Sequence, residues 1–133
     1  MMEELKQHIS KWMEESDHII LVIDLNLHIL DSEEAESLCN IGLHEVIADK
    51  HQEESSVPTH QSGAVPIDGI FASGSITISS GGHLPFGEVC SDHRALWVKV
   101  KISNAFGHTL HKTPLFISRR VKCNNPRFLE RFN

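Results

Sequence analysis

The sequence predicts an α+β domain, in which helices and strands follow one another without a regular alternation. Two observations favour this class. An amphipathic segment at the start has helical spacing, and several short apolar runs further along have the length and composition of strands. The 133 residues are enough for one domain with a modest core.

The helices are expected mainly in the first third of the chain. Leu5, Ile9 and Trp12 recur at helical spacing among acids and lysines, which predicts an amphipathic helix over residues 3–15. A second helix should begin at the cap residue Ser32, with acids in its first turn. Residues 43–47 have the pattern of another short helical stripe.

The first predicted strand covers residues 19–25 and ends in two polar groups. It is apolar almost throughout, which predicts a central strand buried on both faces. Asp24 and Asn26 are spaced by two, so they should lie on the same face of the strand. Both residue types also favour turns, so a capping role for Asp24 and a turn conformation for Asn26 are the structural alternative.

The remaining strands are expected in the second half of the chain. The polar stretch 50–63 predicts an exposed loop. Strands should follow at 67–72, 75–79 and 95–102, and the last of these alternates as if one of its faces were buried and the other wet. Pro126 is a candidate start for a final helix.

Composition favours a soluble intracellular protein. Apolar residues make up 40% of the chain and charged ones 23%, and no run reaches the length of a transmembrane span. The first sixteen residues are charged and amphipathic, unlike a signal peptide. The three cysteines share no metal-like spacing, so reduced thiols are expected.

The net charge of −6 is distributed unevenly between the two parts of the chain. Residues 1–93 contain three lysines and seventeen acids, whereas residues 94–133 contain nine Lys and Arg residues and Glu130 alone. The basic tail, about residues 103–133, is therefore suited to a phosphate backbone or an acidic partner. Alternatively, its cations pair with acids of the same fold.

The stretch from Pro66 to Val98 contains the most informative polar residues. Asp68 is at the head of one apolar run, and the triplet Ser91-Asp92-His93 precedes another. If the two strands are neighbours, Asp68 can orient the imidazole of His93 and stabilise its protonated form, as in general base catalysis. On spacing alone, an Asp and a His at such positions are more often surface residues or local capping groups.

The amino-acid sequences of these motifs resemble those of a known family. The strings P-I-D-G-I-F-A-S, from residue 66, and S-D-H-R-A-L-W-V, from residue 91, resemble the last third of the endonuclease/exonuclease/phosphatase superfamily, which has the DNase-I-like fold. The strand ending in I-D-L-N at residues 23–26 looks like the family's G-D-x-N strand. Pro58-Thr59-His60 stands where the family often has Pro-Thr. The resemblance covers about residues 5–133.

The resemblance implies a role for each matching residue in phosphodiester hydrolysis. Asp24 would orient or activate the attacking water, and Asn26 would donate to a phosphate oxygen. Asp92 would hold Mg²⁺ (or Mn²⁺), which prefers carboxylate oxygens and water. His93 would contact the phosphate or act as the base, oriented by Asp68.

The sequence departs from the family in two respects. Ile23 stands where the family usually has Gly. The family's domain is about twice as long, and its N-terminal half supplies a metal-binding Glu. The chain therefore resembles one partial domain, residues 1–133, which is half of a four-layer α/β-sandwich with a mixed sheet and helices on its outer face. Its bare inner sheet face should bind a missing N-terminal half or a second copy.

Two functions follow from the resemblance. The first is divalent-metal-dependent hydrolysis of a nucleic acid or another phosphodiester, incomplete in the isolated chain, as in the C-terminal part of a nuclease or a retroelement-type endonuclease. The second is a degenerate, non-catalytic module that binds nucleic acid or a protein partner through its basic C-terminal segment. The missing Glu favours the second function, and the presence of all five polar site residues favours the first.

Overall fold

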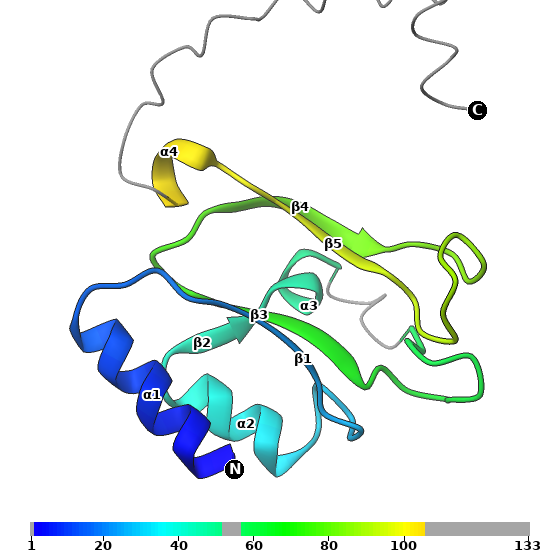
Figure 1. Ribbon diagram of the computed structural model, residues 1–133, viewed down its shortest axis with the longest axis horizontal. Coiled ribbons are helices and arrows are strands. Elements are labelled where there is room, and N and C mark those ends of the chain that lie inside the picture. The colour runs from blue at the N-terminus through cyan, green and yellow to red at the C-terminus, as the bar shows by residue number, and fades with distance from the viewer. Residues whose placement is uncertain (1, 52–56, 106–133) are drawn as a thin grey trace, which may run out of the picture.

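The computed structural model describes residues 2–51 and 57–105, which form an α+β arrangement of helices and small antiparallel sheets (Figure 1). The elements follow in the order α1 (Met2–Glu14), β1 (Ile20–Asp24), α2 (Glu33–Asn40), β2 (Leu43–Glu45), α3 (Val46–His51), β3 (Asp68–Ser73), β4 (Ile78–His83), β5 (Leu96–Val100) and α4 (Ile102–Ala105). The predicted α+β class is confirmed at this level.

The first sheet has the strand order β1-β3-β2, with β3 antiparallel to both neighbours. The prediction that the first strand is central is therefore wrong, because β3 holds that position. Burial agrees with this order. Gly69 to Ser73 are buried, whereas Ile20 and Val22 of β1 are 40% and 67% exposed. The apolar segment that was predicted to be central, β1, is thus an edge strand of the described sheet.

Helices α1 and α2 cover one face of this sheet (Figure 1). Phe71 of β3 is fully buried there and packs in one cluster with Ile9 of α1 and Leu38 of α2. The N-terminus of α2 is capped as predicted, because the Ser32 side chain accepts a hydrogen bond from the Ala35 backbone at 3.2 Å. This cap satisfies one of the free N–H groups in the first turn.

The pair of strands β4 and β5 lies over the opposite face, together with α3 (Figure 1). Ile70 and Ala72 of β3 share a cluster with Ile47 of α3 and Ile78 of β4. The alternation predicted for the last strand is found over Leu96–Val100: its Leu, Val and Val side chains pack against this cluster, whereas Trp97 and Lys99 are exposed. The predicted extension of this strand to residue 102 is wrong, because Ile102 begins α4 (Ile102–Ala105) and is 49% exposed.

The segment predicted as a helical stripe over 43–47 is instead strand β2 followed by α3. Glu45 at the junction explains the change. Its carboxylate is buried and accepts hydrogen bonds from the backbone N–H of Ala48, at the start of α3, and of Ile70, in β3. Burial raises the pKa of Glu45. One side chain thus ends the strand and begins the helix.

The predicted strand 75–79 is displaced toward the C-terminus, because β4 runs from Ile78 to His83. Gly81 and Gly82 lie inside this strand. A Cβ at Gly82 would be 3.4 Å from the Trp97 ring, and one at Gly81 would be 3.2 Å from the Val98 side chain. The close approach of β5 therefore favours glycine at position 81, whereas a Cβ at position 82 would make an ordinary van der Waals contact.

Two further expectations concern the whole chain. The mixed sheet is not found among the described residues, since every pairing there is antiparallel. The basic tail, about 103–133, and the helix from Pro126 lie outside the described residues apart from 103–105, which belong to α4. None of the helices within 2–51 and 57–105 is long and apolar enough to cross a membrane.

Candidate functional site

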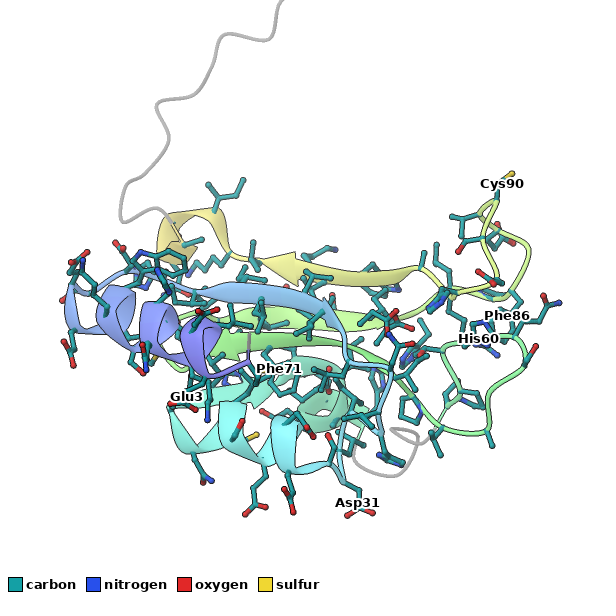
Figure 2. All side chains as sticks on the ribbon, turned by 60° about the horizontal axis from the view of Figure 1, so that its bottom comes forward. Glu3, Asp31, His60, Phe71, Phe86 and Cys90 are labelled. Atoms are coloured by element: carbon teal, nitrogen blue, oxygen red, sulfur yellow. The ribbon has the colours of Figure 1, made fainter. Side chains whose placement is uncertain are left out.

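The polar residues singled out in the sequence gather at one end of the two sheets. Asp24 is the last residue of β1, Asp68 is the first of β3, and the two are paired directly in the antiparallel register. His93 precedes β5 and reaches the same place. Figure 2 shows His60 at this end of the molecule, near the β4–β5 connection that includes Phe86 and Cys90.

Thr59 fixes the start of β3 in this site. Its side chain is fully buried, and its hydroxyl accepts hydrogen bonds from the backbone N–H of Ile67 at 2.9 Å and of Asp68 at 3.1 Å. The prediction of an exposed loop over 50–63 is therefore wrong at this point, because α3 extends to His51 and Thr59 belongs to the interior.

The same short segment also holds the residues around His93. The Arg94 N–H donates to the Thr59 carbonyl at 2.7 Å, and the Gln61 N–H donates to the Asp92 carbonyl at 2.8 Å. His60 and His93 form an isolated antiparallel bridge between these bonds. Residues 58–61, which we call the clamp segment, thus join Asp68 and His93 through backbone and hydroxyl groups.

Asp68 and His93 form the pair that the sequence predicted. Nδ1 of His93 lies 2.8 Å from Oδ2 of Asp68. Because a carboxylate only accepts, Nδ1 is the protonated nitrogen and Nε2 has the lone pair when the ring is neutral. The pKa of His93 is raised, chiefly by this hydrogen bond and further by the charges of Asp68, Asp24 and Asp92.

Asp24 and Asn26 have the turn geometry that was the structural alternative. The Asn26 backbone N–H donates to Oδ1 of Asp24 at 2.9 Å, and Asn26 has a positive φ of 54°. The expectation that both side chains share one strand face is wrong, because β1 ends at Asp24 and the chain turns before Asn26. Asp24 is nonetheless close to the pair, since Asp24, Asp68 and His93 each have a potential ligand atom within 4.8 Å of the others.

Asp92 is placed differently from the other acids, and its neighbour is a residue that sequence reasoning did not single out. Nε2 of His60 lies 3.3 Å from Oδ2 of Asp92. The pKa of Asp92 is lowered, first by its own backbone N–H and then by the hydrogen bond to His60. The only signal for His60 in the sequence is its position directly after Pro58-Thr59.

Asp92 has an exposed carboxylate of the kind that Mg²⁺ binds. This ion takes oxygen ligands, often one or two carboxylates, and keeps several waters. The Asp92 side chain is 67% exposed, so water and a phosphate oxygen can complete the coordination of an ion bound there. Asp92 therefore fits the predicted role, although its nearest protein neighbours are imidazoles rather than further oxygens.

A hollow of about 370 Å³ lies beside the site. Arg94 lines it, and the same guanidinium donates to the Pro58 carbonyl at 2.8 Å and stacks 4.0 Å above the ring of Phe86. Burial, followed by the charge of Arg94, lowers the pKa of His83 in this wall. The hollow is lined by Ile47, His51, Val57, Gly81, Gly82, His83, Arg94 and Trp97, so it lacks a carboxylate.

The comparisons with known proteins add no relative to this description. No family model matches the chain, and neither a curated protein nor a solved structure matches it.

We expect Thr59→Val to destabilise the protein, because the N–H groups of Ile67 and Asp68 lose their acceptor in a buried place. A buried donor without a partner costs about 1–3 kcal/mol. Urea unfolding measures this loss. Thr59→Ser is the matched control, since it keeps the hydroxyl and should cost less than about 1 kcal/mol. Equal stabilities of the two variants would contradict the role of the hydroxyl.

Asp68→Asn should lower the pKa of His93, measured by NMR titration of its ring signals. Asp24→Asn and Asp92→Asn should produce smaller shifts, because these groups act on His93 only through charge. The raised pKa stabilises the fold below the unfolded pKa of His, and this stabilisation is lost as the pH rises through the folded pKa. Asp68→Asn should therefore weaken that pH dependence. An unchanged titration would refute the assigned hydrogen bond.

Proposed function

We propose that this chain catalyses, or supplies half of a site for, divalent-metal-dependent hydrolysis of phosphodiesters. The observation that carries the proposal is the Asp68–His93 hydrogen bond of 2.8 Å beside the carboxylate of Asp24. The resemblance of the motifs to the DNase-I-like superfamily supports the same reaction. A site of this kind needs a base, an oriented water and a cation near the phosphate.

In this proposal each residue of the site has a separate role. Asp68 holds the imidazole so that Nε2 of His93 faces away from the carboxylate and accepts a proton from water or contacts the phosphate. Asp24 orients the attacking water with the oxygen that does not accept from the Asn26 backbone. The Asn26 amide donates to a phosphate oxygen. Asp92 would hold Mg²⁺, which when bound offsets the charge of the phosphate.

A second candidate function is non-catalytic association with another protein, here a second copy of the chain. The exposed apolar side of β1 favours it. Val22 and Ile20 face outward on the strand that forms one edge of the described sheet. An unpaired edge with apolar side chains is a template for strand pairing. Binding through the basic segment 103–133 also stays a proposal, since nearly all of that segment lies outside the described residues.

The enzymatic proposal is tested by Mg²⁺-dependent nicking of supercoiled plasmid and by cleavage of bis(4-nitrophenyl) phosphate, which needs little substrate recognition. His93→Ala should reduce the rate about 100-fold or more, the usual loss for a general base. His8→Ala on α1 is the matched control and should leave the rate unchanged. A folded protein without either activity, or a His93→Ala variant with the wild-type rate, would count against catalysis.

The association proposal is tested by sedimentation velocity over a range of concentrations. Val22→Lys should shift the protein toward the monomer, because a charge at this 67% exposed position opposes pairing along β1. Val89→Lys is the matched control, since Val89 is 39% exposed but lies on the β4–β5 connection. A wild type that sediments as a compact monomer at high concentration would exclude the dimer.

A further inference from the structure

We propose that His60, Asp92 and His93 form a binding site for a transition-metal cation of the Zn²⁺ type. Each of the three residues offers one ligand atom, and these atoms lie within 4.8 Å of one another. A single bound cation requires a slightly closer approach, since bonds of about 2 Å from one ion to two ligands hold those ligands within about 4 Å of each other, so the three ligand atoms would draw together on binding. This proposal does not depend on hydrolytic activity.

The arrangement of the three side chains is set by the backbone. The bridge between His60 and His93 places the two rings against each other, with centroids 4.9 Å apart at an interplanar angle of 73°. The bond from the Gln61 N–H to the Asp92 carbonyl fixes the third ligand beside them. All three ligands thus come from two segments joined to each other, so little rearrangement is needed on binding.

The ligand types indicate which cation this group would prefer. Two imidazoles and one carboxylate suit Zn²⁺, Co²⁺ and Ni²⁺, whereas Mg²⁺ and Ca²⁺ require mainly oxygen ligands. The group is also open: the side chains of His60 and Asp92 are 28% and 67% exposed. A cation can therefore enter from solvent, and water can complete a tetrahedral set.

Asp68 supports the metal site through its hydrogen bond with His93. Histidines that bind metals usually donate their other ring N–H to a carboxylate, which fixes the tautomer and makes the ligand nitrogen more basic. Asp68 accepts from Nδ1 of His93 at 2.8 Å, so Nε2 is the nitrogen available to a cation. Asp24 and Asp68 add negative charge nearby, which further favours a cation over a neutral occupant.

A simple surface ion pair between His60 and Asp92 is the competing explanation of this contact. An ion pair involves only these two residues and gains nothing from His93. A metal site requires both imidazoles and the carboxylate, and it depends on Asp68 as well. The two explanations therefore differ in which substitutions change the affinity for a cation.

Calorimetric titration of the full chain with Zn²⁺, and separately with Mg²⁺, tests the proposal. Zn²⁺ should bind more tightly than Mg²⁺, and His60→Ala should weaken Zn²⁺ binding more than about 10-fold, since even second-shell changes cost 10- to 100-fold. Asp68→Asn should weaken Zn²⁺ binding by about 10- to 100-fold. His18→Ala, far from the site in sequence and hydrogen-bonded to Ser75, is the matched control and should bind like the wild type.

Histidine ring NMR of the wild type provides a second readout that needs no substitution. Zn²⁺ should move the Nε2 signals of both His60 and His93 at the same equivalent of metal. Movement of His93 alone would overturn the proposal and assign the cation to the group with Asp24 and Asp68. Equal Zn²⁺ affinities of the wild type and His60→Ala, or the absence of Zn²⁺ binding, would overturn it as well.

Discussion

The hydroxyl of Thr59 is the point on which the candidate site depends. It accepts from two successive backbone N–H groups at the start of β3, while the carbonyl of the same residue accepts from Arg94. One buried residue therefore holds the strand that begins with Asp68 and the segment that includes His93. The direct hydrogen bond between Asp68 and His93 lies in partly exposed surroundings, where such bonds are weak, so the buried contacts of Thr59 add support that this bond alone would not give.

Local features of the sequence predicted much of the fold. The amphipathic pattern of α1, the Ser32 cap and the alternation of β5 depend on neighbours within a few residues, and all three are found. The failures concern long-range packing. Whether an apolar strand is central or at an edge depends on what pairs with it, so the composition of β1 could not reveal that β3 lies at the centre.

The site was predicted in part, for the same physical reason. Asp68 and His93 can be recognised in the sequence because each precedes an apolar run, and they are expected to lie close together if the two strands are neighbours. His60 and Glu45 have no such local signal. His60 matters because of a bridge to a residue 33 positions away, and Glu45 because its carboxylate reaches Ile70 across the sheet. Such contacts exist only after the chain has folded.

Asn26 shows how one spacing allows two interpretations. A separation of two residues places side chains together only while the strand continues, and the positive φ of Asn26 marks the place where it stops. Asparagine adopts this conformation more readily than most residues, so its presence here has a backbone reason as well as a chemical one. The amide can still serve a phosphate, but from a turn rather than from the face of a strand.

Catalysis and binding of a transition metal at this site both require the same lone pair, that of Nε2 of His93. The hydrogen bond to Asp68 commits Nδ1 of His93, so the ring has one lone pair left, on Nε2. That nitrogen either accepts a proton during hydrolysis or binds a cation with His60, and it cannot do both at once. Asp92 is shared in the same way between Mg²⁺ and a softer ion. A transition metal held by His60, Asp92 and His93 would therefore block the base while it is bound, and release of that ion would be needed before His93 could act on water.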